Sequence, residues 1–173
     1  MTTLRLATPA DADALASLAR EAFVAAFGTL YTPEDLENFL AADRSPAKNA
    51  AHIADPATRI ALIEEDGALL AYCLIKLGEQ FDEHPDPRPQ RPVFLSQLSC
   101  KGTATGRGLG KVLTDWAIAE ARDWGADAIT LSVFSENYGA QRFYQRIGFV
   151  HVADIFFWVG SKRDDEFLYQ LRL

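Results

Sequence analysis

Cysteine, basic residues and long apolar runs are all scarce in this chain, and each scarcity excludes a class of protein. The two cysteines, Cys73 and Cys100, lie in apolar strand-like runs, so we expect a reduced, buried pair and no disulfide framework. No apolar run is long enough to cross a bilayer, and the N-terminus has no signal core. Lys and Arg number 17 against 24 Asp and Glu, and this acidic balance argues against general nucleic-acid binding. We therefore expect a cytoplasmic protein with neither nucleic acid nor membrane as a partner.

What remains is the composition of a globular domain. Hydrophobic residues make up 49% of the 173 residues, so we expect one domain, 1–173, with a proper core. Strands are predicted at residues 2–7, 59–64, 69–77, 93–100, 128–134, 150–159 and 166–173, and helices after Thr8, Thr32, Ser45, Gly108 and Asn137. Residues 160–165 read as a polar turn. Residues 78–92 are rich in proline and form a loop, which we expect to be a lip over the binding site.

A glycine-rich turn joins strand 93–100 to the helix after it. Gly106, Gly108 and Gly110 sit where that helix must begin, and glycine lets backbone N–H groups come close to a ligand. The helix dipole adds positive potential at the same point, which suits a phosphate group. Three basic residues lie in this stretch, with no acidic residue from Cys100 to Thr114. The turn therefore predicts an anionic, phosphate-bearing ligand.

Two common phosphate-binding motifs do not fit this turn. The P-loop needs glycine at position 105 and Ser or Thr at position 112, where the chain has Thr105 and Val112. The dinucleotide fingerprint would place its third glycine on Lys111. The turn Thr105-Gly106-Arg107-Gly108-Leu109-Gly110 instead resembles the Gln/Arg-x-x-Gly-x-Gly/Ala turn of the GNAT superfamily of N-acetyltransferases, with Thr105 replacing the first residue. In that family the turn holds the pyrophosphate of acetyl-CoA.

The strand before the turn changes its parity. Apolar residues occupy odd positions at Val93 and Leu95 and even positions at Leu98 and Cys100, which a strand of fixed register does not do. One extra residue near Ser96-Gln97, a β-bulge, would explain the change. GNAT enzymes have a bulge in this strand, where it turns backbone groups toward the thioester.

Residues 137–149 carry a second and more specific pattern. They read Asn137-Tyr138-Gly139-Ala140-Gln141-Arg142-Phe143-Tyr144-Gln145-Arg146-Ile147-Gly148-Phe149, which matches the GNAT signature Asn-x-x-Ala-x-x-Phe-Tyr-x-x-x-Gly-Phe. The spacing predicts a short helix over residues 138–147 that Gly148 closes. On one face of it, Phe143 and Ile147 can pack while Tyr144 is held toward the splayed strands. With both motifs, the chain resembles GNAT N-acetyltransferases over nearly its whole length.

The resemblance implies a fold, a co-substrate and a set of contacts. The fold is a single-domain α/β fold with a mixed, mostly antiparallel twisted sheet of about seven strands, splayed at strands 4 and 5, and helices on both faces. The co-substrate is acetyl-CoA, and no metal is expected. The residues expected to contact acetyl-CoA are Leu98, Ser99, Cys100, Thr105, Gly106, Arg107, Gly108, Leu109, Gly110, Lys111, Asn137, Ala140 and Phe143. The first two helices form one wall of the acceptor site in the family, so Phe27, Tyr31, Glu34 and Asp35 are candidate acceptor contacts, unless the aromatics pack and the acids cap a helix.

The family's reaction is direct acyl transfer from acetyl-CoA to a primary amine in one ternary complex. No Cys or Ser has a partnered base in the sequence pattern, and Cys100 reads as a small apolar strand residue. By resemblance, Tyr144 is the catalytic residue, a general acid to the CoA thiolate, and the N–H of Leu98 or its neighbour faces the thioester oxygen. The general base stays open. The family's usual carboxylate positions hold Ser132 and Phe94 or Leu95, and the substitutes are Glu136, His84, Glu34 or a water chain.

The acceptor amine is where the sequence stops being specific. Residues 23–40 look like the spermidine/spermine-type branch of bacterial GNAT enzymes, and acidic clusters at residues 64–66, 82–86 and 164–166 would suit a polyamine. A protein N-terminus, a lysine side chain, an antibiotic or an amino acid remain open as acceptors. A non-catalytic acetyl-CoA-binding sensor and a nucleotide-using α/β protein also remain open, and the resemblance allows a homodimer.

Overall fold

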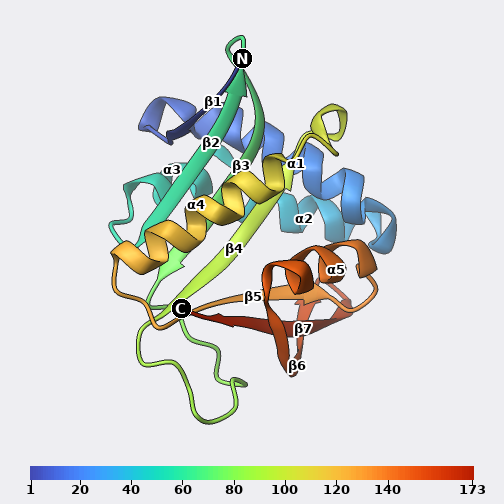
Figure 1. Ribbon diagram of the computed structural model, residues 1–173. Coiled ribbons are helices and arrows are strands. Elements are labelled where there is room, and N and C mark those ends of the chain that lie inside the picture. Colours follow the sequence, from blue (N-terminus) through green and yellow to red (C-terminus); the bar gives the residue numbers. More distant parts are fainter.

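Seven strands form one sheet, whose spatial order departs from the chain order only at its end. The computed structural model describes all 173 residues, and its strands pair in the order β1-β2-β3-β4-β5-β7-β6 (Figure 1). The strands are β1 (Thr2–Leu6), β2 (Thr58–Glu65), β3 (Ala68–Leu77), β4 (Pro92–Cys100), β5 (Ala128–Phe134), β6 (Val150–Val159) and β7 (Lys162–Arg172). Every pair is antiparallel except β4 with β5. The predicted fold class, an α/β fold with a mostly antiparallel seven-stranded sheet, is confirmed.

Four of the five helices begin directly after the predicted residues, whereas the first begins at Ala12 because Thr8 caps a separate 3-10 turn, Pro9–Asp11. The helices are α1 (Ala12–Phe27), α2 (Pro33–Asp43), α3 (Pro46–Ala54), α4 (Leu109–Asp123) and α5 (Tyr138–Ile147). At α2 the Thr32 hydroxyl accepts the N–H of Asp35 at 3.2 Å, and at α3 the Ser45 hydroxyl accepts the N–H of Lys48 at 3.1 Å. Proline opens both helices, where its missing N–H breaks no helical bond. None of the helices combines the length and the apolar character needed to span a membrane.

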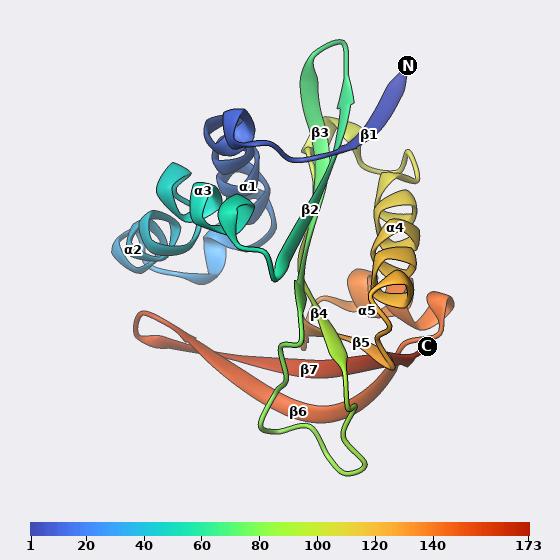
Figure 2. The ribbon, with the colours of Figure 1, turned by 90° about the vertical axis from the view of Figure 1, so that its left-hand side faces the viewer.

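Strands β4 and β5 run side by side only briefly before they separate. Residues 92–94 pair with residues 128–130, and the pairing stops there. Figure 2 shows the consequence: β1, β2 and β3 form one half of the sheet, while β5, β7 and β6 form a second half that is turned strongly away from it. Backbone groups of β4 beyond this point that face β5 have lost their strand partner, so they can bond to a ligand. The predicted splay is confirmed.

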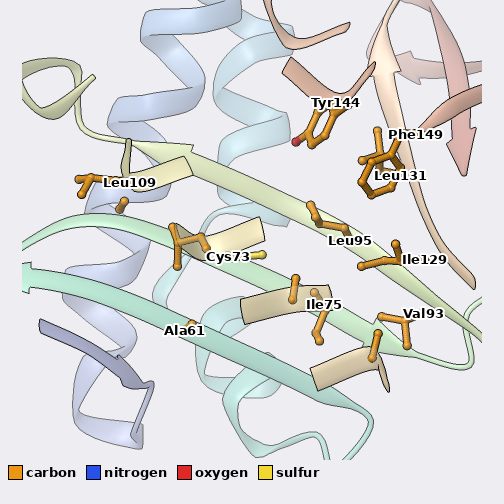
Figure 3. Close-up of a cluster of buried hydrophobic side chains, with 14 of the residues drawn as sticks. Ala61, Cys73, Ile75, Val93, Leu95, Leu109, Ile129, Leu131, Tyr144 and Phe149 are labelled. Atoms are coloured by element: carbon orange, nitrogen blue, oxygen red, sulfur yellow. The ribbon is translucent and has the colours of Figure 1, made fainter. Parts of the chain in front are cut away.

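Helices cover both faces of the sheet. In Figure 2, α1, α2 and α3 lie on one side and α4 and α5 on the other. A cluster of 18 buried residues includes side chains of α4, α5 and the strands they cover, and a smaller cluster of 7 lies under α1. Figure 3 shows part of the larger cluster, where Cys73, Leu95, Ile129 and Tyr144 come from four different elements. The core therefore anchors α5 to the sheet and fixes the position of Tyr144.

The last hairpin is longer than the sequence indicates. Residues 160–165 were expected to form a polar turn, but β7 begins at Lys162, so a two-residue turn joins it to β6. Asp164 is buried within this strand because its carboxylate is hydrogen-bonded to the Tyr31 hydroxyl and to the Lys162 ammonium. Polar composition therefore mispredicts a turn when a charged side chain finds partners inside the fold.

The proline-rich loop, residues 78–91, lies at the opposite end of β4 from the glycine turn (Figure 1). His84 is 3% exposed, and its Nε2 is hydrogen-bonded to Gln170 Oε1 at 2.6 Å. Arg172 donates to the Pro87 carbonyl at 2.7 Å, and Asp127 accepts two backbone N–H groups of the loop at 2.7 and 3.0 Å. These bonds fasten the loop to the end of β7 and to the start of β5. No residue of the loop lines the cavity described below, so the prediction of a lip over the binding site is wrong.

Candidate functional site

A cavity of about 560 Å³ opens where β4 and β5 separate. Its walls come from α1, α2, the two diverging strands, α5 and the β6–β7 hairpin. The lining is mostly apolar with a few converging polar groups, which is the usual composition of a small-molecule site. Segments from both ends of the chain therefore meet around one open cavity.

The predicted bulge lies in β4 at the edge of this cavity. Leu74 pairs with Gln97 and Ile75 pairs with Leu95, so Ser96 has no partner on β3. The extra residue accounts for the change of parity in the sequence, and the prediction is confirmed. Because the strand bends and twists at a bulge, the residues after it are re-aimed relative to β3.

Two backbone N–H groups of β4 after the bulge point away from β3. The N–H of Lys101 donates to the Leu70 carbonyl at 2.7 Å. N–H groups alternate sides along a strand, so those of Leu98 and Cys100 face the opposite side, from which β5 has already departed. Leu98, Ser99 and Cys100 all line the cavity. This stretch of β4 thus offers main-chain donors to a bound molecule.

The glycine turn continues directly from this end of β4, outside the cavity lining. Gly106 and Gly108 have φ angles of +77° and +79°, a left-handed conformation that strains any residue with a Cβ. A Cβ on either residue would meet no atom within 4 Å, so the space beside the backbone is open. The N–H groups of residues 106–108 donate to no backbone carbonyl of the chain, and the first N–H groups of α4 follow them. Such a run of free donors at a helix start fits an anion.

Two of the three basic side chains of this stretch, those of Arg107 and Lys111, are already paired with acidic ones. The Arg107 guanidinium bonds the Glu65 carboxylate at 2.9 and 3.2 Å, and Lys111 Nζ lies 2.6 Å from Asp115 Oδ2. The Thr105 hydroxyl donates to a carbonyl within the turn at 2.9 Å. Most of the basic excess seen in the sequence is therefore compensated within the fold, and only Lys101 has no acidic partner. The capacity of the turn to bind an anion rests chiefly on its backbone N–H groups.

Three predicted acetyl-CoA contacts lie at or in helix α5, and only two of them, Asn137 and Ala140, line the cavity. Asn137 Oδ1 accepts the N–H of Ala140 at 3.2 Å and so caps the helix, and both residues line the cavity. Phe143 does not line it; its ring lies 3.7 Å from the position that a Cβ on Gly110 would take, so it packs α5 against α4. Leu109 is buried in the core. Of these residues, Asn137 keeps an uncommitted amide NH₂ that can face a ligand.

Tyr144 reaches the cavity from α5. Its ring packs edge-on against Phe143 and Phe149, with centroid distances of 5.1 and 5.6 Å, and the residue is 8% exposed. In Figure 3 the hydroxyl points away from Phe149, and it makes no hydrogen bond within the chain. Burial raises the pKa of Tyr144, and the nearby thiols of Cys73 and Cys100 raise it further. The phenol is therefore protonated at neutral pH and free to donate into the cavity.

Both cysteines are free thiols of low reactivity. Cys73 is fully buried and Cys100 is half-buried, and burial raises the pKa of each thiol. The thiolate is the nucleophilic form, so a neutral Cys100 is a weak nucleophile even though it lines the cavity. The site therefore offers no activated thiol for a covalent acyl-enzyme.

The wall formed by α1, α2 and the last hairpin is aromatic. Of the four predicted acceptor contacts, Phe27 and Tyr31 line the cavity, whereas Glu34 and Asp35 do not. Asp35 instead accepts the N–H of Ser161 at 3.2 Å and its hydroxyl at 2.7 Å, which ties α2 to the β6–β7 turn. Glu34 lies exposed in the first turn of α2. The aromatic lining is completed by Phe23, Phe39, Tyr72, Phe134, Phe157 and Trp158.

Four charged residues line the cavity: Asp43 and Arg44 at the end of α2, and Asp164 and Glu166 on β7. The sequence named Asp164 and Glu166 only within an acidic cluster that would suit a polyamine, and it did not single out Asp43. Asp164 and Glu166 lie on β7 and share a face with the buried Leu168, because side chains two apart point the same way. The two-residue spacing of Asp164, Glu166 and Leu168 was the sequence signal that could have placed both acids on one face of a strand. It was overlooked because residues 160–165 were expected to form a turn. Arg44 follows α2 and lies over the rings of Phe23 and Phe39 at 5.6 and 5.3 Å. No sequence pattern pointed to Arg44.

None of the bases suggested by the sequence lies at the cavity. His84 is held inside the proline-rich loop, and Glu34 and Glu136 are exposed. Ser132 and Leu95 do line the cavity, but neither supplies a carboxylate. The structure also contains no group of three or more His, Cys, Asp or Glu side chains that could hold a metal ion.

Comparisons with known proteins agree with this geometry. The model of the acetyltransferase (GNAT) family matches residues 13–149. An uncharacterized N-acetyltransferase of Mycobacterium tuberculosis is 30% identical over 158 residues, which cover 91% of this chain and 95% of that protein. An uncharacterized N-acetyltransferase of Lactobacillus delbrueckii subsp. lactis is 27% identical over 152 residues, 88% of this chain and 86% of that protein.

A solved structure shares the fold over the full length. The crystal structure of PaiA N-acetyltransferase from Thermoplasma acidophilum in complex with coenzyme A has a TM-score of 0.78 to this chain. The match covers 100% of this chain and 99% of that one at 19% sequence identity, so it is a likeness of fold.

Proposed function

The chain belongs to the acetyltransferase (GNAT) family, and we propose that it transfers the acetyl group of acetyl-CoA to a primary amine by direct attack within a ternary complex. One observation carries the proposal. The partner-free Tyr144 hydroxyl and the free main-chain donors of Leu98 and Cys100 face the same cavity, beside a glycine turn with unpaired N–H groups. This combination suits a thioester whose tail carries a pyrophosphate.

Acetyl-CoA fits the groups that line this end of the molecule. The unpaired N–H groups of residues 106–108 and the start of α4 are suited to the pyrophosphate. The open side of β4 supplies donors for the pantetheine amides through Leu98 and Cys100, and Asn137 adds its amide NH₂ from α5. Tyr144 lies two turns along α5 from Asn137. Its hydroxyl is therefore expected to lie beyond the pantetheine contacts, toward the thioester.

The residues then have separate tasks in the proposed reaction. The amine nitrogen forms a bond to the thioester carbonyl carbon while the carbon–sulfur bond breaks. The N–H of Leu98 or its neighbour stabilises the charge that develops on the carbonyl oxygen. Tyr144 donates its proton to the departing sulfur and regains one from the nitrogen. Because the reactants are held together in one cavity, positioning supplies much of the acceleration.

The acceptor is proposed to be a small amine, with a polyamine as one candidate. Of the three acidic clusters in the sequence, only residues 164–166 contribute to the cavity. Glu64 and Glu65 are paired with Arg5 and Arg107, and residues 82–86 belong to the loop away from the site. The aromatic wall and Arg44 favour an acceptor with an apolar or partly anionic body as strongly as a polycation. The single-domain extent of 1–173, a cytoplasmic location and a homodimer stay predictions.

A panel of amines tests the proposed activity. The purified chain is mixed with acetyl-CoA and spermidine, an arylalkylamine, free amino acids, an aminoglycoside, a lysine-containing peptide or a peptide with a free N-terminus. Release of the CoA thiol is followed with a chromogenic disulfide. We expect release that depends on the amine. If acetyl-CoA binds but no amine accelerates thiol release, the chain is a binding module and the proposed activity is refuted.

Thermal denaturation with different ligands tests the proposed co-substrate. A ligand present at 100 times its Kd stabilises the folded state by about 2.7 kcal/mol. We expect acetyl-CoA to raise the Tm and NAD and ATP to leave it unchanged. A rise with NAD or ATP and none with acetyl-CoA would instead support a nucleotide-binding protein.

A further inference from the structure

Glu166 lines the cavity from the middle of the second half of the sheet. It lies on β7 between Phe134 of β5 and Ile155 of β6, with which it is paired in the strand register. It has no Lys, Arg or His partner in the chain, although its side chain is largely enclosed. A carboxylate that is shielded from water and has no cationic partner is costly, so its position calls for a function.

The charged groups that face Glu166 do not neutralise it. Asp164 is next on the same face of β7, and its carboxylate is already engaged by the Tyr31 hydroxyl and the Lys162 ammonium. The cavity-lining residues of β5 and β6 carry no titratable group. Burial raises the pKa of Glu166, Asp164 raises it further, and a hydrogen bond from Ser132 acts in the opposite direction. The Lys162 charge is thus committed to Asp164, and Glu166 is left as a proton acceptor that faces the cavity.

The strand register explains how a carboxylate on β7 can serve the face of β5. Ser132 pairs with Leu168 and Phe134 pairs with Glu166, so Ser132 and Glu166 are diagonal neighbours across the two strands. Ser132 is short and has no carboxylate of its own. The longer side chain of Glu166 therefore takes up the space above it and supplies the missing acid–base group.

We propose that Glu166 is the general base that removes a proton from the ammonium group of the acceptor, a role that rests on the proposed acetyl transfer. The ammonium gives one proton to the Glu166 carboxylate, and the neutral amine attacks the carbonyl carbon. Tyr144 supplies the proton that the sulfur needs and recovers it from the amide-forming nitrogen. Glu166 later releases its proton to solvent, so each turnover yields amide, CoA thiol and one proton.

Asp43 is the competing carboxylate of the cavity. It is the last residue of α2, next to Arg44, and lies on a helix and not on the sheet. Glu166 instead lies on a strand that pairs directly with β5, the strand that leads into Tyr144's helix. Both acids can attract a cation, but Glu166 lies on the sheet itself, opposite Phe134 at the end of β5, and Phe134 also lines the cavity.

The test compares Glu166→Gln with Asp43→Asn and with Glu21→Gln, an exposed glutamate of α1 outside the cavity. With an amine that the wild-type chain acetylates, kcat/KM is measured from pH 6 to pH 10, and acetyl-CoA affinity is measured by titration. We expect Glu166→Gln to lower kcat/KM about 100-fold at pH 7, within the usual range for a general base. The deficit should shrink as the pH approaches the pKa of the amine, because solvent then deprotonates it. Acetyl-CoA affinity and the activity of Glu21→Gln should match wild type.

Each other outcome overturns the proposal. Wild-type activity in Glu166→Gln removes it from proton transfer. A deficit that stays constant with pH, carried mostly by KM, shows that Glu166 only attracts the amine. A deficit of Asp43→Asn that shrinks with pH, without one for Glu166→Gln, assigns the base to α2. If the wild-type chain acetylates no amine, the proposed function itself fails, which the wild-type arm reveals before any variant is compared.

Discussion

Replacing Tyr144 by phenylalanine separates the contribution of its hydroxyl to catalysis from the contribution of its ring to stability. The ring contacts with Phe143 and Phe149 are kept, and the hydroxyl that is removed has no hydrogen-bond partner in the chain. We therefore expect the free energy of unfolding to change by less than about 0.5 kcal/mol. A general acid contributes about 10²- to 10⁴-fold, so kcat should fall by that factor. The loss corresponds to about 2.7–5.4 kcal/mol of transition-state stabilisation, at 1.36 kcal/mol for each factor of ten.

Three measurements on the Tyr144 variants check this reasoning. Thiol release gives kcat, titration gives the Kd of acetyl-CoA, and thermal denaturation gives the Tm. Tyr144→Phe should change only the first. Tyr144→Ala is the contrasting variant, because loss of a buried ring costs about 3–5 kcal/mol and should lower the Tm as well. Unchanged turnover in Tyr144→Phe would remove Tyr144 from the mechanism. A parallel loss of acetyl-CoA affinity would show that the hydroxyl serves binding and not proton donation.

Three further predictions concern the glycine turn, the ion pair between Arg5 and Asp11, and the carboxylate of Glu166. Gly108→Ala forces a Cβ into φ +79° at a cost of about 1–2 kcal/mol and should weaken acetyl-CoA binding; Gly78→Ala, at φ +78° and at the opposite end of β4 from the glycine turn, should lose similar stability in denaturation but keep the Kd. Arg5 bonds both carboxylate oxygens of Asp11 at 2.8 Å and lowers the pKa of Asp11. This stabilisation is present above pH 3.8 and is lost as the pH falls below that value. Asp11→Asn should therefore lower the free energy of unfolding by about 1–3 kcal/mol at pH 7 and make its dependence on pH flatter in acid. The pKa of Glu166 is raised in the folded state, so its ionisation opposes folding above pH 4.5. Glu166→Gln should therefore have a higher Tm than wild type at pH 7 and the same Tm near pH 3.5. A lower Tm at pH 7 would contradict the burial argument.

The parts of the molecule that the sequence predicts well are those encoded by neighbouring residues. The glycine turn, the bulge near Ser96 and the helix over residues 138–147 each follow from a contiguous pattern, and each is found where it was predicted. Local backbone chemistry decides these features, because positive φ angles, strand parity and helix caps depend on a few adjacent positions. The position of Tyr144 follows from the same helix.

The parts that the sequence mispredicts depend on partners distant in the chain. Asp164 can be buried in a strand because the hydroxyl of Tyr31, more than a hundred positions earlier, donates a hydrogen bond to its carboxylate. The proline-rich loop is held away from the cavity by Asp127 and Gln170, which belong to or adjoin other strands. Asp35 is hydrogen-bonded to Ser161 of the final hairpin and does not line the cavity. None of these pairings leaves a periodic trace, since hydrogen-bond partners across a sheet can lie at any separation.

The two ends of the proposed site therefore differ in how the chain builds them. The co-substrate end is assembled mainly from one continuous segment, β4, the glycine turn and α4, to which α5 adds Asn137 and Tyr144, so much of its geometry is set by backbone conformation. The acceptor end draws Phe27, Tyr31 and Arg44 from the first third of the chain and Glu166 from the last strand. If Glu166 is the base, proton removal is carried out by the same strand that helps form the acceptor wall, and not by the strands that hold the thioester. Substitutions in α1, α2 or β7 could then change the amine together with its deprotonation while leaving acetyl-CoA binding intact, which is why the Kd for acetyl-CoA is the decisive control for every acceptor-side variant.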